Sequence, residues 1–375
     1  MLIKNCKIIY IDKIEEGSIL IKSGKIEEIN PKSFGDEEII DGNGCYLSPG
    51  FIDVHIHGAG GVDTMDGTYD SLNRISKIIC EFGTTSFLPT TMTCSKDDIK
   101  RALRSIKEAK NRGTEGANVL GVHLEGPFIS PNKIGAQNPN FILKPSIDDF
   151  EEIVSENVDI VKSITLAPEV EGAYDLIKYL ACKKIKISMG HTKATYEEAM
   201  EGIKCGSSHT THLFNAMTGF THREPGVVGA VFDSEITTET IADGIHIAYP
   251  VLRATYKIKT SEKVLLVTDA MMACAMPEGK YSLGGQDVYV KDGAARLKEG
   301  SLAGSVLTLD RAVRNVKNNS SLPLYEIVKM VTFNPAKHCK VEDSKGKIEE
   351  GFDGDVILFD EDINVKKVII GGKVK

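Results

Sequence analysis

A strand that carries two histidines decides how this chain is read. It runs Ser48-Pro49-Gly50-Phe51-Ile52-Asp53-Val54-His55-Ile56-His57-Gly58. Residues two apart on a β-strand point to the same side, so His55 and His57 share one face of an otherwise apolar strand. Imidazole is the commonest metal-ligating side chain. The pair therefore predicts half of a metal site, and the alternative interpretation is that one histidine caps the strand while the other belongs to the core.

The bulk composition is that of a globular protein rather than of a nucleic-acid or membrane binder. The 375 residues are 41% hydrophobic and 26% charged, with a formal net charge of −8. A negative chain matches the polyanionic surface of nucleic acid poorly, and we expect neither a nucleic-acid nor a membrane partner. The sequence contains no apolar run near the ~18 residues that a membrane helix needs. A locally basic site for an anionic substrate stays compatible with these totals.

The eight cysteines are scattered along the chain, without a CxxC pair. In a chain of this length, such spacing is typical of buried thiols in a reducing compartment. The first ten residues lack the positive stretch and the long apolar run of a secretion signal. We therefore expect a cytoplasmic protein.

Both ends of the chain are strand-like and differ from the middle. Short apolar runs, broken by Gly17 and Gly24, fill the first 48 residues, and two more lie at 355–360 and 365–370. We expect the two ends to pair into one small β-sandwich domain made of residues 1–48 and 343–375. Residues 49–342 would then form the second, larger domain.

The middle of the chain alternates strands with helices. Eight strand-like runs are expected, at 51–57, 84–89, 119–125, 161–166, 185–191, 207–212, 238–243 and 264–269. Helical runs lie between most of them, which implies parallel strands joined by crossover helices. The count, and a span of roughly 250 residues, favour an α/β fold of the closed (β/α)8 or TIM barrel type. A Rossmann fold is the rival, but the first strand is not followed by a GxGxxG motif.

Local signals mark helix starts in this alternation. Thr195 and Glu198 form a capping-box pattern, and Pro250 suits the first turn of a helix. Two segments interrupt the alternation. Residues 281–297 are expected to form a hairpin with turns at their glycines, and residues 214–234 show little periodicity. Long irregular loops in a compact domain are usually functional.

Side chains of metal-ligating types recur at the ends of these strands. They are His55, His57, Glu125, His191, His212 and Asp269. The C-terminal rim of a (β/α)8 barrel is its catalytic face, so these residues are expected to converge there. A carboxylate directly after a buried apolar strand, as at Asp269, costs several kcal/mol unless it is paired. His209 is expected on the opposite side of its strand from His212, which leaves His212 as the ligand.

The predicted ligand set fits a divalent transition metal. Glu125, His191 and His212 are expected to hold one ion, and His55 with His57 allows a second beside it. Imidazole and carboxylate ligands suit zinc first, with iron, cobalt or manganese also compatible. The sequence thus predicts a metal-dependent enzyme with one or two divalent ions per chain.

Motifs along the whole chain carry a family resemblance. They lie at 48–58, 123–128, 190–192, 211–217, 222–226, 243–246, 268–271, 302–305 and 346–356. The first and the last resemble the opening and closing signatures of the amidohydrolase superfamily. Together, the motifs resemble the family of N-acetylglucosamine-6-phosphate deacetylases within it. The resemblance implies hydrolysis of N-acetylglucosamine 6-phosphate to glucosamine 6-phosphate and acetate, in amino-sugar catabolism or cell-wall recycling.

The resemblance also implies roles for individual residues. Asp269 would be the general acid/base, and Glu125 would replace the carboxylated lysine that bridges metals in other members of the superfamily. The phosphorylated N-acetyl amino sugar would be contacted by Ala136, Gln137, Asn215, Ala216, Arg223, His246, Leu302 and Ala303. Of these, Arg223 and His246 would bind the phosphate. In the family some phosphate contacts come from the partner chain, which implies a homodimer.

One position departs from the family pattern. Many members carry a histidine where this chain has Gln137, and that histidine is thought to polarise the amide carbonyl. Glutamine can donate a hydrogen bond but carries no charge, so the metal is expected to take more of that task here.

Two other functions remain as alternatives. The nearer is another amidohydrolase, such as a dihydroorotase or a deaminase, but those enzymes commonly need a carboxylated lysine where this chain has Glu125. The other is a metal-free barrel that serves as a binding or scaffolding protein. That protein would have lost its ligands, whereas every predicted ligand is present here.

Overall fold

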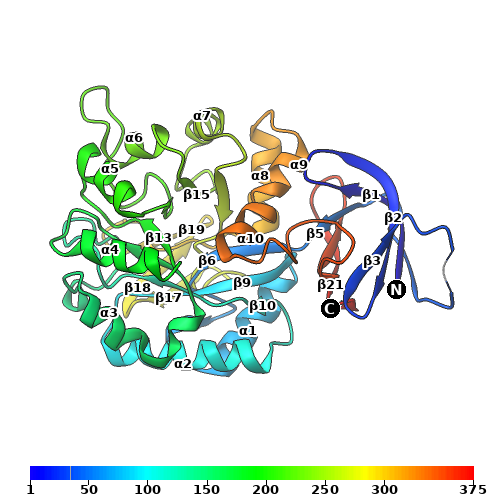
Figure 1. The fold of residues 1–375 in the computed structure, drawn as a ribbon, viewed down its shortest axis with the longest axis horizontal. Coiled ribbons are helices and arrows are strands. Elements are labelled where there is room, and N and C mark those ends of the chain that lie inside the picture. Colours follow the sequence, from blue (N-terminus) through cyan, green and yellow to red (C-terminus); the bar gives the residue numbers. More distant parts are fainter. Residues whose placement is uncertain (34) are drawn as a thin grey trace.

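Parallel strands form a ring at the centre of the molecule, in a computed structural model that describes residues 1–33 and 35–375 (Figure 1). The ring strands are β6 (Phe51–Ile56), β9 (Thr84–Thr91), β11 (Val122–Glu125), β12 (Val161–Leu166), β13 (Lys186–Met189), β14 (His209–Thr210), β15 (Thr237–Ile241) and β16 (Val264–Val267). The ring closes where the chain after β16 meets β6, because the Asp269 N–H donates to the His55 carbonyl at 2.9 Å and Ile56 bridges Ala270. The predicted (β/α)8 barrel is confirmed.

The third predicted strand is interrupted. A two-residue strand, β10 (Asn118–Val119), pairs with β9, and β11 starts only at Val122. Between them the Leu120 N–H donates to the Phe87 carbonyl at 3.0 Å. From β11 onward the alternation is regular, and it directs His123 and Glu125 into the barrel.

Helices follow the strands and cover the outside of the ring. They are α1 (Tyr69–Cys80), α2 (Lys96–Arg112), α3 (Ile147–Val154), α4 (Ala173–Cys182), α5 (Tyr196–Cys205), α6 (Gly226–Phe232), α7 (Tyr249–Lys259) and α8 (Leu309–Asn319), with α9 (Leu324–Lys329) and α10 (Phe333–Cys339) beyond them. The capping box is present, because Thr195 Oγ1 accepts the Glu198 N–H and the Glu198 carboxylate accepts the Thr195 N–H. Pro250 lies in the first turn of α7, as predicted. Among the described residues, the helices lack the length and apolar character needed to cross a bilayer.

One helix lies in a segment where the sequence showed little periodicity. α6 occupies residues 226–232 of the predicted irregular stretch 214–234. Its first six residues are all buried, so it has no polar stripe. A helix that is apolar all round leaves no amphipathic period to detect.

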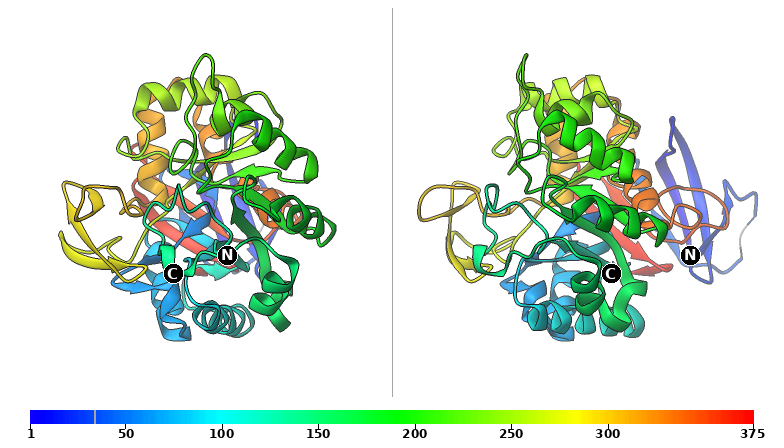
Figure 2. Two further views of the ribbon diagram at one scale, coloured as in Figure 1. Left: turned by 90° about the vertical axis from the view of Figure 1, so that its left-hand side faces the viewer. Right: turned by 60° about the vertical axis from the view of Figure 1, so that its left-hand side comes forward.

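A small meander lies over one side of the barrel mouth. It consists of β17 (Gly279–Leu283), β18 (Gln286–Lys291) and β19 (Ala294–Leu297), paired antiparallel. Figure 2 shows it in yellow, projecting beside the ring. The predicted hairpin segment 281–297 is therefore present as three strands, with turns at Gly284-Gly285 and Asp292-Gly293 as predicted.

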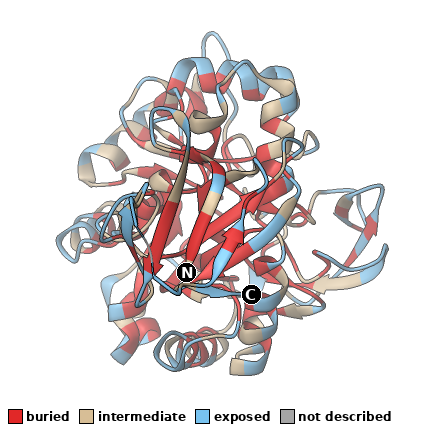
Figure 3. Ribbon diagram, turned by 90° about the vertical axis from the view of Figure 1, so that its right-hand side faces the viewer, coloured by how far each residue is buried: buried red, intermediate tan, exposed pale blue. Residues whose placement is uncertain are grey.

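The two ends of the chain share one sheet outside the barrel. Its strands are β1 (Leu2–Ile9), β2 (Ile14–Lys22), β3 (Lys25–Ile29), β4 (Ile39–Asp41), β5 (Tyr46–Pro49), β20 (Val356–Phe359), β21 (Val365–Ile370) and β22 (Lys373–Val374). The N- and C-terminal parts join where β5 pairs antiparallel with β20, with Leu47 opposite Leu358. Ile19, Leu47 and Leu358 lie in its buried core, and Figure 3 shows the buried residues concentrated on the strands. The separate terminal sheet is confirmed, while its boundaries at 1–48 and 343–375, against 49–342, stay a prediction.

Candidate active site

Four predicted site residues lie just beyond barrel strands rather than on them. They are His57, His191, His212 and Asp269. Backbone φ is 46° at His191, 28° at His212 and 48° at Asp269, in the left-handed region that residues other than glycine rarely adopt. The left-handed turn at His212 breaks the two-residue alternation of β14. The prediction that His209 and His212 face opposite sides is therefore wrong, since both side chains reach carboxylates inside the barrel.

Glu125, His191 and His212 form one compact group. Glu125 Oε1 lies 3.2 Å from His191 Nε2 and 3.1 Å from His212 Nε2, and the two ring nitrogens are 3.2 Å apart. All three side chains are buried, and they come from β11 and from the loops after β13 and β14. Three distant parts of the sequence thus meet at one point.

His55 and His57 form a second group beside the first. Their Nε2 atoms are 3.4 Å apart. His57 Nε2 lies 3.3 Å from Glu125 Oε2 and 3.3 Å from Asp269 Oδ1. Asp269 Oδ1 also lies 3.5 Å from His55 Nε2. Glu125 therefore faces both groups at once.

The spacing of these atoms fits metal ligands. Donor atoms placed tetrahedrally at about 2.0–2.1 Å from an ion lie about 3.3 Å apart, and the spacings within the two groups run from 3.1 to 3.5 Å. His57 Nδ1 donates to the Thr90 carbonyl at 3.2 Å, and His191 Nδ1 donates to the Lys133 carbonyl at 3.0 Å. Because a carbonyl only accepts, each ring keeps a proton on Nδ1 and leaves Nε2 as the nitrogen that can bind a metal. A cation among these converging nitrogens and carboxylate oxygens would satisfy all of them, so these residues fit a divalent metal.

Buried carboxylates surround the rings. Burial alone would lower the pKa of His55, but the carboxylates, Asp269 foremost, outweigh burial and raise that pKa to about 9. Burial would raise the pKa of Asp269, yet His55 and His57 hold it below its usual value. A field that favours positive charge on the rings equally favours a bound cation.

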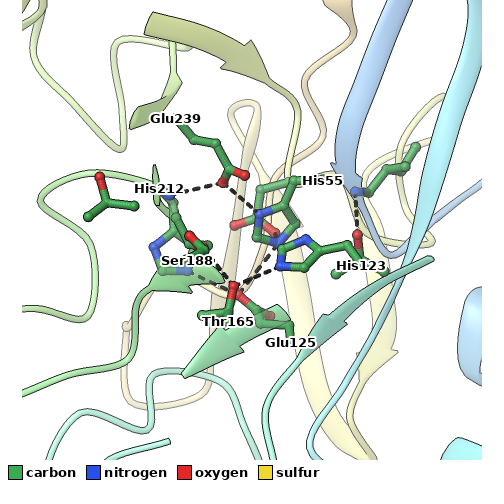
Figure 4. Close-up of polar contacts among 12 residues, drawn as sticks. His55, His123, Glu125, Thr165, Ser188, His212 and Glu239 are labelled. Atoms are coloured by element: carbon green, nitrogen blue, oxygen red, sulfur yellow. Dashed lines mark hydrogen bonds and ion pairs between the residues drawn. The ribbon is translucent and has the colours of Figure 1, made fainter. Parts of the chain in front are cut away.

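Glu239, on β15, is a buried residue that sequence reasoning missed. Its Oε2 accepts the His55 Nδ1–H at 2.9 Å and the backbone N–H of His212 at 3.1 Å (Figure 4). Its Oε1 accepts the His209 Nε2–H at 3.2 Å. The available signal was the one applied to Asp269: a carboxylate inside a buried strand needs partners.

His123 lies beneath the second group. Its ring is 4.7 Å from that of His55, and its Nε2 lies 2.7 Å from Thr165 Oγ1 (Figure 4). Burial, reinforced by the charge of His55, lowers the pKa of His123 to about 3. His55, His123 and Glu239 are also close enough together to count as a third set of metal-type ligands. A neutral His123 is nevertheless best described as packing support.

Gln137 points at a carboxylate. Its Nε2 donates to Glu125 Oε2 at 2.6 Å, and its Oε1 accepts the Thr93 N–H at 2.7 Å. These two bonds fix which end of the amide faces Glu125. The side chain therefore orients the carboxylate shared by both groups.

A cleft of about 590 Å³ opens over these groups at the barrel mouth. The lining includes His57, Glu125, His191, His212 and Asp269, and also the predicted sugar contacts Ala136, Gln137, Asn215, Ala216, His246 and Leu302. Ala303 is buried next to the lining, whereas Arg223 is exposed and lies outside it. The structure thus gathers most predicted contacts in one space and leaves Arg223 outside.

Two charged features of the cleft bear on anion binding. His246 Nδ1 lies 2.6 Å from Asp243 Oδ2, which leaves its Nε2 as the free ring nitrogen. Lys133, which the sequence reasoning missed, is the one Lys or Arg among the described lining residues. A Cβ built on Gly135, two residues along, would lie 3.7 Å from the Ala216 side chain. The Lys133 loop therefore runs beside the predicted sugar contacts.

Comparisons with known proteins agree with this geometry. The amidohydrolase family profile matches residues 46–375. An N-acetylglucosamine-6-phosphate deacetylase from Lysinibacillus sphaericus is 38% identical over 378 residues, covering 100% of this chain and 97% of the relative. An N-acetylgalactosamine-6-phosphate deacetylase from Escherichia coli O157:H7 is 33% identical, covering 96% and 95%. The crystal structure of N-acetylglucosamine-6-phosphate deacetylase from Pasteurella multocida superposes with a TM-score of 0.95 at 33% identity, covering 100% and 99%.

Proposed function

The chain belongs to the amidohydrolase family, and we propose that it is a metal-dependent deacetylase that hydrolyses N-acetylglucosamine 6-phosphate to glucosamine 6-phosphate and acetate. This function belongs to amino-sugar catabolism or to the recycling of cell-wall sugars. The observation that carries it is the position of the two ligand groups at the floor of a sugar-sized cleft. A dihydroorotase, a deaminase and a metal-free binding protein are set aside, because full-length relatives share the deacetylase activity and the ligands are present.

The ligand groups would hold two divalent ions. Glu125, His191 and His212 would hold the first, and His55 with His57 the second, with Glu125 shared between them. We propose zinc, because three- and four-membered sets of imidazole and carboxylate are its ordinary ligands. When bound, such ions act as Lewis acids that lower the pKa of water and polarise a carbonyl.

Asp269 would move the protons of the reaction. It lies at the edge of the cleft, and its pKa stays below the usual value of aspartate, so it is ionised at neutral pH and ready to accept. It takes a proton from the attacking water as the new C–O bond forms. It then gives that proton to the amine nitrogen as the C–N bond breaks, which lets glucosamine 6-phosphate leave as a neutral amine.

The rest of the cleft would orient the sugar. Gln137 holds Glu125 in place, which assigns it a positioning task in addition to a contact with the acetyl group. At the other end His246 would take the phosphate through Nε2, and Lys133 would add a permanent positive charge. Asn215, Ala216, Leu302 and Ala303 would complete the wall around the ring.

Arg223 would reach the phosphate from a second copy of the chain. A guanidinium binds phosphate through two parallel hydrogen bonds, and this one is exposed and outside the cleft of its own chain. These facts support a homodimer with a shared phosphate site. The eight cysteines, all free, support a cytoplasmic location.

The experiment compares acetate release from four sugars on the metal-loaded enzyme. They are N-acetylglucosamine and N-acetylgalactosamine, each with and without the 6-phosphate. We expect kcat/KM to be highest for the phosphorylated gluco sugar and at least 100-fold lower for both unphosphorylated sugars. A higher value for the phosphorylated galacto sugar would assign the second activity, which the E. coli relative makes the specific alternative. Equal rates with and without phosphate would refute the proposal.

A further inference from the structure

Glu239 is buried at the point where the two ligand groups meet the barrel wall. It is 1% exposed and lies below the cleft, whose described lining does not include it. It therefore has no route to substrate. Any role it has in the reaction must act through its hydrogen bonds.

Those hydrogen bonds reach both ligand groups through one oxygen. Oε2 accepts from the ring of His55, which belongs to the second group, at 2.9 Å. The same atom accepts from the backbone of His212, which belongs to the first group, at 3.1 Å. Figure 4 shows the carboxylate above the two histidines, with a contact to each. The second bond meets the backbone where φ is 28°, a strained conformation that needs external support.

The other oxygen keeps the carboxylate from turning. Oε1 accepts from His209 Nε2 at 3.2 Å, and His209 Nδ1 is itself 2.7 Å from Thr237 Oγ1. The Leu213 N–H also donates to the Glu239 carbonyl at 3.0 Å, so the backbone of β15 holds the same turn. The carboxylate is thus held in one orientation before any ion arrives.

We propose that Glu239 is the common positioning residue of both metal subsites. Its carboxylate sets the tautomer of His55, so that Nε2 offers a lone pair to the second ion. At the same time it holds the strained turn that aims His212 Nε2 at the first ion. A carboxylate is required, because only an acceptor-only group can accept from both donors at Oε2 and from His209 at Oε1.

Glu239→Gln removes this capacity with little change of volume. A glutamine side chain has one accepting oxygen and one NH2 group, so it cannot accept from His209 at one end and from His55 and His212 at the other. We expect the second ion to be lost, so that metal analysis falls from two ions per chain to about one. We expect the remaining site to bind its ion 10- to 100-fold more weakly, the usual cost of losing a hydrogen-bonded partner of a ligand.

The experiment counts ions and measures their affinity without substrate. Purified wild-type and variant proteins are stripped with chelator, reloaded with Zn²⁺ or Co²⁺, and measured by mass spectrometry of metals and by the Co²⁺ absorption spectrum. Glu169→Gln is the matched control, since the Glu169 carboxylate accepts from Thr192 Oγ1 and from the Lys193 N–H beside His191 but touches no ligand ring. The control should keep two ions and the wild-type spectrum.

The outcomes separate this inference from the proposed function, on whose two-ion centre it rests. Two ions of unchanged affinity in Glu239→Gln would overturn the role of Glu239 alone. A single ion in the wild type would overturn the two-ion centre, and this inference with it. Should the variant not fold, imidazole ¹⁵N spectra of the Zn²⁺-loaded wild type decide: the His55 signal, assigned by its loss in His55→Asn, should show a proton on Nδ1 and none on Nε2. A proton on Nε2 would refute the inference.

Discussion

The barrel mouth and the terminal sheet differ in which residues adopt strained, left-handed backbone conformations. At the mouth, His191, His212 and Asp269 adopt left-handed φ values while buried or nearly so. In the terminal sheet the same region of φ falls mainly on exposed turn residues such as Asn30 and Asn43, with Ile363 as a buried exception. Asparagine tolerates that conformation well, whereas strain in buried residues persists only where the surroundings enforce it.

This difference separates the barrel mouth, which carries the chemistry, from the terminal sheet, which contributes mainly to stability. At the mouth, carboxylates and imidazoles pack together in an arrangement that favours a bound cation. The same arrangement lowers the stability of the metal-free fold. The terminal sheet has an apolar core, in which Ile19 and Leu47 are fully buried. Substitutions at the mouth should therefore change activity and spare stability, and substitutions in the sheet should do the reverse.

The largest expected effect is at the mouth. Asp269→Asn keeps the shape of the side chain but can no longer accept the proton of the attacking water. We expect kcat/KM to fall by about 10³-fold, equivalent to about 4 kcal/mol in the transition state. The melting temperature of the metal-loaded protein should change little, because the side chain keeps its size and shape. Initial rates and thermal melts of the loaded protein measure both.

The control for Asp269→Asn is metal content. The variant should still carry His55, His57, Glu125, His191 and His212, so the first ion should remain bound. A variant that loses all metal would show that Asp269 acts as a ligand and would leave the proton transfer unsupported. Unchanged turnover with full metal content would contradict the acid/base role directly.

A substitution in the terminal sheet should have the opposite effect, on stability rather than on activity. Leu358 is buried in β20 opposite Leu47, where the two ends of the chain pair. Leu358→Ala should cost about 3 kcal/mol of unfolding free energy, through lost transfer energy and a cavity. The rate per folded, metal-loaded molecule should stay within twofold of the wild type. A large loss of specific activity, measured well below the unfolding transition in urea, would mean that the sheet supports the mouth.

The same comparison explains what the sequence could predict. The barrel strands carry apolar runs and the ligands follow them, so the positions of His191, His212 and Asp269 could be read from local pattern. The terminal strands stand out as short apolar runs between glycines and polar turns. Both depend on neighbours within a few residues, which a sequence displays directly.

What escaped prediction depends on partners that are distant along the chain. Glu239 stands among threonines on β15, and its partners His55 and His209 lie on other strands. The left-handed turn at His212 is enforced by tertiary contacts rather than by residue type, so strand alternation misplaced His209. α6 is surrounded by apolar neighbours and therefore carries no periodic signal.

A smaller effect tests the charge at the rim of the mouth. Lys133→Met should raise KM for the phosphorylated sugar about tenfold, which is about 1.4 kcal/mol, the lower end of a hydrogen bond to a charged group. The value of kcat should change little, because the Lys133 carbonyl that holds His191 is kept. Lys133→Arg should retain most of the affinity. An equal rise of KM for the unphosphorylated sugar would show that Lys133 shapes the loop instead of binding phosphate.

The smallest expected effect tests whether the metal site at the barrel mouth depends on the stability of the adjacent helix α5. Thr195 caps α5 four residues after His191, and its hydroxyl accepts the Glu198 N–H. Thr195→Ala should cost about 1 kcal/mol of unfolding free energy, the usual loss of an N-cap. If the left-handed turn at His191 is held by the cluster, metal content and kcat should stay unchanged, as in the sheet variant. If the turn is held by the helix that follows it, metal affinity should fall together with stability, and the separation between mouth and scaffold would then hold only for the distant sheet.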